Sequence, residues 1–189
     1  MHRPLRIVLP DRRDAEAVFL ALDDGGDAVW LDSGPGATGG HSVIGIADAS
    51  SARLVVGADG RLIRSDADGD VVLAGSVFDA LAESLVADDP IDAGAVDPVA
   101  PFEEPGPGWF GWFGYEVGAA AAGAPVHAAE TPGAAWVRLD RLVVIDHAAD
   151  AVVLRTAGRA GDAEWAAATV ARIAAIPNGP LPAPAAPPP

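Results

Sequence analysis

The stretch AAWVRLDRLVVIDHAADAVVLR, residues 134–155, decides the fold class of this 189-residue chain. Its first part, 134–145, and its last part, 151–155, are dominated by apolar residues, many of them β-branched, as is typical of strands. The residues between them, 146–150, read Asp-His-Ala-Ala-Asp and are typical of a turn. The stretch therefore predicts a long antiparallel hairpin.

Shorter strand-like segments precede this hairpin and are separated by turn residues. Apolar residues at helical spacing predict helices at 13–22, from Ser76 to Val86 and at 162–176, with Asp11 and Ser76 near helix starts. Strands broken by helices at irregular intervals predict an α+β fold with a largely antiparallel β-sheet and two to three packing helices. The expected strands before the hairpin are 5–9, 28–32, 43–47, 53–56, 62–63, 71–73 and 109–115.

The C-terminal residues differ in composition from the rest of the chain. Residues 177–189 read PNGPLPAPAAPPP, which favours an extended linker and excludes helix or central strand. We therefore expect one domain over residues 1–176 and a Pro/Ala-rich linker or tail over residues 177–189.

Composition and charge exclude several function classes. The chain has 27 acidic and 12 basic residues and a net charge of −15, so we expect no binding to nucleic acid. All twelve basic residues are arginine, which excludes a Schiff-base lysine and a phosphate-loop lysine. The absence of cysteine excludes thiolate metal sites and a cysteine nucleophile.

No stretch of the sequence has the features of a targeting or membrane segment. The apolar run near the N-terminus, Leu5 to Leu9, is too short for the core of a signal peptide. No other run approaches the ~18 apolar residues that a membrane helix needs. We therefore expect no membrane partner and a cytoplasmic location.

Residues 34–39, GPGATG, have the G-x-G-x-x-G spacing of dinucleotide sites. A dinucleotide site needs a helix N-terminus after the glycines, because the pyrophosphate binds there. The residues that follow, His41 to Ala47, favour a strand instead. The motif is therefore interpreted as a glycine-rich hairpin loop.

Other polar groupings are interpreted as structural. Asp66 to Asp70 resembles the start of a calcium loop, but Val77 stands where the closing glutamate belongs, which favours a turn. Glu103 and Glu104 are interpreted as solvated charge in a proline-rich loop. No histidine lies at metal-ligand spacing from another, and each favours a surface or hydrogen-bonding role; they are His2, His41, His127 and His147.

The segment from Trp109 to Tyr115 is the least ordinary part of the sequence, with five aromatic residues among seven and glycines at Gly111 and Gly114. Glycine weakens a strand unless another backbone or a bulky ring must come close. Two interpretations are open: a buried core strand with aromatic packing, or a strand lining a ligand pocket or an inter-domain surface.

Three ordered segments resemble one enzyme family. The first is Val29 to Ser33, which is followed after the glycine loop by His41 to Gly45; the others are Gly108 to Gly118 and Ala135 to His147. They resemble the N-terminal region of the chorismate-utilising enzymes, component I of aminodeoxychorismate synthase and of anthranilate synthase. The form Trp-Leu-Asp-Ser at 30–33 is more similar to the aminodeoxychorismate branch, with the anthranilate branch as the alternative.

The resemblance implies a reaction for the complete enzyme. Chorismate binds with Mg²⁺, ammonia from a glutamine amidotransferase subunit is added, and the product is 4-amino-4-deoxychorismate, a precursor of p-aminobenzoate and folate. In the family these steps belong to a C-terminal chorismate-binding domain or subunit, which we expect to be missing here. The resemblance therefore assigns no catalytic residue, no metal and no cofactor to this chain, and whether the chain alone is an enzyme stays open.

The same resemblance implies an effector site. In the family the N-terminal region helps to frame a pocket that binds tryptophan, and Leu31, Asp32 and Ser33 match its motif. A serine hydroxyl at a strand end can bond the polar head of an amino acid. Gly40 stands where the family usually has arginine or lysine, so a cation for the ligand carboxylate is missing there. The alternative to a synthase fragment or split subunit is a non-catalytic effector-binding or scaffolding module.

Overall fold

The computed structural model describes residues 3–34, 36–87, 104–127 and 129–177, which form two compact units. Unit 1 comprises the described residues within Met1–Ile46, Phe102–Gly106 and Arg141–Pro189, and unit 2 those within Ala47–Pro101 and Pro107–Asp140. Each unit contains one five-stranded sheet in which every pairing is antiparallel. The fold is therefore α+β, as predicted, but with two sheets and, among the described residues, four helices.

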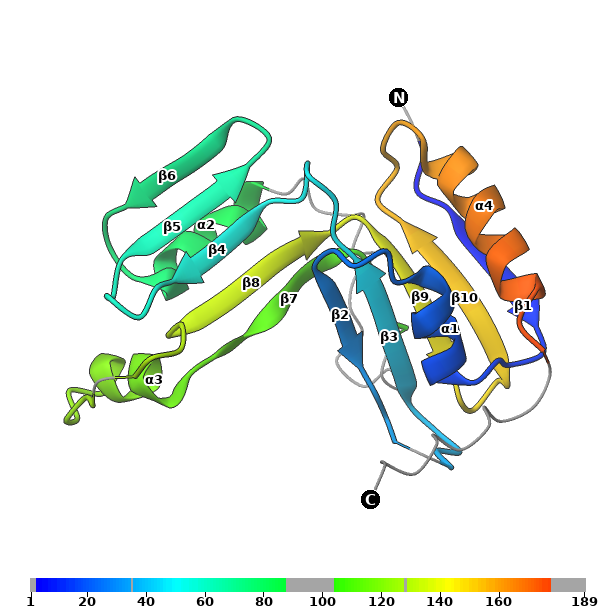
Figure 1. The fold of residues 1–189 in the computed structure, drawn as a ribbon, viewed down its shortest axis with the longest axis horizontal. Helices are drawn as coiled ribbons and strands as arrows, with labels where there is room; N and C mark the ends of the chain where they lie inside the picture. The colour runs from blue at the N-terminus through cyan, green and yellow to red at the C-terminus, as the bar shows by residue number, and fades with distance from the viewer. Residues whose placement is uncertain (1–2, 35, 88–103, 128, 178–189) are drawn as a thin grey trace, which may run out of the picture. The chain divides into compact units, whose positions relative to one another are not determined.

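The sheet of unit 1 has the strand order β1-β10-β9-β3-β2. Helices α1 (Ala15–Leu22) and α4 (Asp162–Ala174) pack on one face of this sheet (Figure 1). The strands are β1 (Arg6–Pro10), β2 (Ala28–Leu31), β3 (His41–Ile46), β9 (Arg141–Asp146) and β10 (Ala151–Thr156).

The core of unit 1 forms where the two helices meet the sheet. Ile44, Val143 and Leu154 come from adjacent strands and share one face, because Ile44 pairs with Val143 and Val143 with Leu154. Val18 of α1 and Ile173 of α4 pack against them. All five side chains are buried, which removes them from water and stabilises the unit.

The sheet of unit 2 has the strand order β6-β5-β4-β8-β7. Helix α2 (Val77–Ala87) packs through Val77 and Ala80 against Leu54 of β4, Leu62 of β5 and Ala134 of β8. Helix α3 (Tyr115–Ala121) follows β7 directly. The strands are β4 (Arg53–Val56), β5 (Leu62–Asp66), β6 (Gly69–Leu73), β7 (Gly108–Phe113) and β8 (Ala134–Leu139).

The predicted hairpin of 134–155 is partly wrong. Its second half is confirmed, since β9 and β10 pair through Asp146 and Ala151. Its first half is not one strand, because the chain leaves the sheet of unit 2 at Leu139 and joins the sheet of unit 1 at Arg141. Apolar β-branched residues lie on both sides of Asp140, so the pattern shows strand on each side without showing the change of sheet.

Local signals at the other elements are largely confirmed. Ser76 begins α2, since its Oγ accepts from the Asp79 amide at 3.1 Å and donates to the Asp79 carboxylate at 2.7 Å. Helix α1 is capped by Asp14 rather than Asp11, because the Asp14 carboxylate accepts from the Ala17 amide at 3.1 Å. Tyr115 belongs to α3 and not to a strand, so that part of the prediction is wrong.

Some predictions concern residues outside the described ranges. Most of the loop expected at 88–108 and nearly all of the tail at 177–189 lie there. The boundary between a domain of 1–176 and a tail of 177–189 stays a prediction. Among the helices of the described ranges, none has the length and apolarity required to span a membrane.

Candidate functional site

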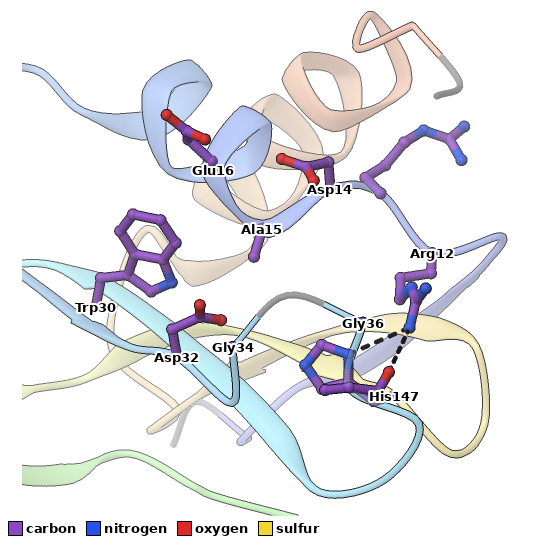
Figure 2. A pocket seen from close by; sticks show the side chains of 11 residues that line it. Arg12, Asp14, Ala15, Glu16, Trp30, Asp32, Gly34, Gly36 and His147 are labelled. Carbon is purple, nitrogen blue, oxygen red and sulfur yellow. Dashed lines mark hydrogen bonds between the residues drawn. The ribbon is translucent and has the colours of Figure 1, made fainter. Parts of the chain in front are cut away.

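A charged cavity of about 600 Å³ lies within unit 1, a size in the range of ligand sites (Figure 2). It is formed by the residues before and at the start of α1, the end of β2, the glycine loop and the β9–β10 turn. Its side chains combine one tryptophan with residues of both charges. The lining residues are Arg12, Arg13, Asp14, Ala15, Glu16, Trp30, Asp32, Gly34, Gly36, Ala37 and His147.

Strand alternation places two of these residues on the helix side of the sheet. Trp30 pairs with Ile44, whose side chain packs against the helices, and Asp32 follows two residues later. The Trp30 ring stacks on Phe19 of α1, with 5.2 Å between ring centroids and 18° between planes. Trp30 therefore presents a fixed aromatic wall to the cavity.

A serine hydroxyl beside the cavity forms every hydrogen bond that it can form. Ser42 of β3 is completely buried, and its Oγ lies 2.7 Å from Asp32 Oδ1 and 2.8 Å from His147 Nε2. The same oxygen accepts from the backbone N–H of Ser33 at 3.1 Å. Since an ionised carboxylate only accepts, the Ser42 proton goes to Asp32, and both lone pairs receive donors.

The tautomer of His147 follows from its neighbours. Arg12 Nη1 lies 3.2 Å from His147 Nδ1, and a guanidinium can only donate. Nδ1 therefore accepts, and the neutral ring carries its proton on Nε2, which donates to Ser42. Burial, and after it the positive charge of Arg12, lowers the pKa of His147 below its ordinary value.

Asp32, Ser42 and His147 are the residue types of a hydrolase triad, but their order is different. In a triad the imidazole takes the serine proton and the carboxylate holds the far side of the imidazole. Here the carboxylate holds the serine proton, and the far side of the imidazole faces Arg12. This arrangement holds the three side chains in fixed positions and does not activate the Ser42 hydroxyl as a nucleophile.

The cavity carries opposite charges on two sides. Arg12 is held by His147, by the Ala37 carbonyl at 3.2 Å and by Asp150 at 3.5 Å. Among the described residues, nothing is hydrogen-bonded to its Nη2, nor to Oδ2 of Asp32. Figure 2 shows Arg12 and His147 at one end of the cavity and Trp30 and Asp32 toward the other. A ligand with a carboxylate, an ammonium group and an aromatic ring complements these three features.

The structure separates the three residues predicted for effector binding. Asp32 lines the cavity, whereas Leu31 and Ser33 do not. Leu31 alternates to the other side of β2 and is half exposed, and the Ser33 hydroxyl donates to the His41 carbonyl at 2.8 Å. Gly40 brings no cation to this region, but the Arg12 guanidinium, from another segment, lines the cavity.

Sequence reasoning missed three residues of this site: Arg12, Ser42 and His147. Arg12 and His147 are 135 positions apart, and Ser42 and His147 are 105 apart, so no local spacing connects them. Ser42 and His147 lie in segments that carry the family resemblance, but neither was predicted as a site residue, and the Asp-His pair at 146–147 was interpreted as an ordinary turn. The turn itself is confirmed, since the Asp146 carboxylate accepts from the amides of Ala148 and Ala149.

The glycine loop and the aspartate-rich turn have the structural roles predicted for them. The loop leads into β3 and not into a helix, with positive φ at Gly34, Gly36 and Gly40. Residues 66–70 turn from β5 into β6. Among the described residues, no three histidine, aspartate or glutamate side chains are grouped so as to hold a metal, and we assign no magnesium chemistry to them.

The interpretation of Glu104 as solvated charge is wrong. Its carboxylate binds Arg6 at 2.7 Å and Arg155 at 2.9 Å and is only 13% exposed. Burial alone would raise the pKa of Glu104, but the hydrogen bonds from Arg6 and Arg155 lower it below its ordinary value. Glu103 lies outside the described residues.

Unit 2 has a cavity of its own, of about 660 Å³, whose character is different. Its walls are mostly apolar and come from the β4–β5 turn, the start of α2, and α3 with the residues after it. Glu116 at its edge accepts from the His127 amide at 2.7 Å, which fixes the segment after α3. Among the residues that the structure describes, no arginine lines this cavity.

Comparison with known proteins does not assign a family. No protein-family model matches this chain, and no curated protein sequence matches it. A functional assignment must therefore rest on the site itself and on the sequence resemblance.

Proposed function

We propose that this chain is the N-terminal, non-catalytic region of a chorismate-aminating enzyme of the aminodeoxychorismate synthase component I type, and that its unit 1 cavity binds an aromatic α-amino acid. The observation that carries the proposal is the cavity itself. It combines the Trp30 ring, the Asp32 carboxylate and the Arg12 guanidinium beside the Trp-Leu-Asp-Ser segment. The anthranilate synthase branch is the alternative.

The ligand chemistry follows from the three groups. The ligand carboxylate would bind Arg12, whose Nη2 is available, and the ammonium would bind Asp32. The aromatic ring would pack on Trp30, which is 37% exposed although it stacks on Phe19. In this proposal chorismate and Mg²⁺ bind to a separate chorismate-binding domain or subunit, and a glutamine amidotransferase supplies the ammonia.

Exposed aromatic residues in unit 2 support a packing role for the same region. Phe78 and Phe113 are in contact, with 4.7 Å between ring centroids, and are 40% and 39% exposed. Trp112 is 46% exposed. Trp112 precedes Phe113 in β7 and therefore points to the opposite face of the sheet. Exposed aromatic side chains favour burial against another domain or subunit. The chorismate-binding partner is the occupant that the family resemblance implies.

Calorimetry on the 189-residue chain tests the effector site. L-Tryptophan is expected to bind, whereas tryptamine, which lacks the carboxylate, and indole-3-propionate, which lacks the ammonium group, should each bind at least about tenfold more weakly. Equal affinity for the three compounds, or no binding of any, would contradict the proposal.

Two variants test which charged residue binds the ligand carboxylate and which binds its ammonium group. Arg12→Gln should weaken L-tryptophan but not tryptamine, and Asp32→Asn should weaken L-tryptophan but not indole-3-propionate. Asparagine keeps an oxygen that accepts from Ser42, so the second variant changes charge more than structure. Arg172→Gln is the matched control, since Arg172 does not line the cavity.

A further inference from the structure

His147 is hydrogen-bonded to Arg12 directly and to Asp32 through Ser42, although it lies neither on β2 nor in the segment before α1. Its Nδ1 faces Arg12, the proposed carboxylate ligand, at 3.2 Å. Its Nε2 reaches Ser42 at 2.8 Å, and Ser42 holds Asp32, the proposed ammonium ligand, at 2.7 Å. One imidazole ring therefore connects the two groups that bind opposite charges.

We propose that His147 is a positioning residue whose neutral Nε2–H form holds Arg12 and Asp32 in their binding geometry, so that amino-acid binding is coupled to the deprotonated state of this ring. The proposal rests on the proposed function and adds its regulation by protons. The neutral ring is the only form that satisfies both contacts, since it accepts at Nδ1 and donates at Nε2.

Protonation removes one of these contacts. An imidazolium carries N–H on both nitrogens, so its Nδ1–H points at the Arg12 N–H and a cation faces a cation. Among the described residues, the Arg12 side chain then keeps the Ala37 carbonyl and the exposed Asp150 carboxylate. The imidazolium offers no N–H to the ligand in exchange, because Nε2 remains on Ser42.

The charged groups around the ring set the direction of its titration. Burial and the charge of Arg12 lower the pKa of His147, and His41 of β3 acts in the same direction. Asp32 after β2 and Asp146 of β9 act in the opposite direction and do not overcome the lowering. The ring is therefore neutral at neutral pH and gains its proton only on acidification.

Nuclear magnetic resonance of the free chain, without any ligand, tests the hydrogen-bond network around His147. The ¹⁵N shifts of the His147 ring should show the Nε2–H tautomer at pH 7.5. Arg12→Gln should raise the pKa of His147, because a neighbouring cation is removed, and Asp32→Asn should lower it further. An Nδ1–H tautomer, or a pKa that does not respond to Arg12→Gln, would overturn the proposal.

Calorimetry with L-tryptophan between pH 5 and pH 8 tests the coupling. Affinity should be constant above the pKa of His147 and fall by up to about tenfold per pH unit below it, as one-proton linkage requires. His147→Gln should bind about tenfold more weakly at pH 7.5 and lose the pH dependence. His127→Gln, at a histidine that does not line this cavity, should behave as wild type.

The outcomes separate this inference from the proposed function. Binding with no pH dependence, or tighter binding at low pH, would overturn the coupling while the effector site stands. Absence of L-tryptophan binding at every pH would overturn the proposed function and the coupling together. The tautomer and the response to Arg12→Gln would then show whether the network exists in the free chain.

Discussion

The two units use the same architecture, a five-stranded antiparallel sheet with helices, but bury different kinds of side chain. In unit 1 the strands β9 and β10 each have four consecutive buried residues, and a buried polar group, Ser42, has all its hydrogen-bonding capacity used. In unit 2 the edge strand β6 has four exposed residues in succession. Buried N–H groups without a partner among the described residues occur in both units: Arg13 Nε beside the cavity of unit 1, and the indole N–H groups of Trp109 and Trp136 in unit 2.

The comparison shows which interactions fix a unique packing arrangement in each unit. A buried polar network is costly unless every member is paired, so a fully paired one fixes a unique arrangement. In unit 1 the buried Ser42 hydroxyl beside the cavity is paired in full, whereas unit 2 relies on the close approach of strands and aromatic rings. Four substitutions, each with a measurable effect on stability or on local opening, test this difference between the two units.

The largest effect is expected from Leu154→Ala in the core of unit 1. Leu154 is fully buried between β1, β9 and the helices, so truncation should cost about 3 kcal/mol of unfolding free energy. Val72→Ala in β6 is the matched change in unit 2 and should cost less than about 0.5 kcal/mol, because Val72 is 52% exposed. Amide hydrogen exchange in each sheet measures both; equal losses would remove the contrast between the sheets.

Gly111→Ala probes the close approach of strands in unit 2. A Cβ at this position would collide with the Ala135 carbonyl oxygen and would lie 2.7 Å from Trp136 Cα. The β7–β8 pair must shift to admit it, at a cost of about 2 kcal/mol.

Gly118→Ala is the control for this change, since nothing lies within 4 Å of its added Cβ and the position is helical. It should be neutral or stabilising by up to about 1 kcal/mol. Urea unfolding followed by tryptophan fluorescence measures both variants. A Gly111→Ala chain as stable as wild type would show that the β7–β8 approach is loose.

Asp162→Asn tests a second buried polar group of unit 1. The Asp162 carboxylate accepts from Arg141 Nε at 2.8 Å and from the Gly158 and Arg159 amides at 3.0 and 2.7 Å. Asparagine turns one acceptor into a donor, which should cost about 1.5 kcal/mol at pH 7. Glu164→Gln, an exposed change in the same turn of α4, should cost much less.

The pH dependence of this loss has a defined sign. Burial would raise the pKa of Asp162, but the Arg141 hydrogen bond and the backbone amides lower it overall. Its stabilising contribution is therefore complete above the unfolded pKa, about 4, and is lost as the pH falls through the lower folded value. Thermal unfolding from pH 2 to pH 7 should show wild type and Asp162→Asn converging in acid; a constant difference would contradict this account.

The smallest effect is expected from Asp150→Asn. Asp150 is 74% exposed and lies 3.5 Å from Arg12 Nε, so the pair should contribute less than about 0.5 kcal/mol and less still in high salt. Asparagine also tolerates the positive φ of 53° at this position. Thermal unfolding in low and high salt measures it. A loss above about 1 kcal/mol would mean that Asp150, rather than His147, is the main anchor of Arg12.

Local signals in the sequence predicted local structure well. The β-branched runs at β9 and β10, the turn between them and the Ser76 cap depend on neighbouring residues, and each is confirmed. The close approach expected at Gly111 is present, since the ring and backbone of Trp136 occupy the space of a side chain there. The interpretation of the aromatic segment as a buried core strand is confirmed only in part, because Trp109 packs against the core of unit 2 and Phe113 packs on Trp136, whereas Trp112 and Phe113 are well exposed.

The rest of the structure depends on contacts between distant residues. The chain changes sheet at Asp140, since β8 pairs with strands of unit 2 and β9 with strands of unit 1, and strand-like residues on both sides of Asp140 conceal this change in the sequence. The site depends on Arg12 and Ser42 meeting His147 across more than 100 positions. Asp32 was predicted because it lies in the effector motif that the resemblance implies. Ser42 and His147 lie in other segments of that resemblance, which gives them no role, and Arg12 lies in none of its segments.

Chemical-shift mapping with L-tryptophan tests the central claim most directly, because it compares both cavities in one measurement. The account predicts saturable shifts of the Trp30 indole N–H and of the Ala15, Asp32 and Ala37 amides, with none at Val117 or Ala120 in the cavity of unit 2. Saturable shifts confined to the unit 2 cavity, or no saturable shift at all, would contradict the assignment of the charged cavity as an amino-acid site.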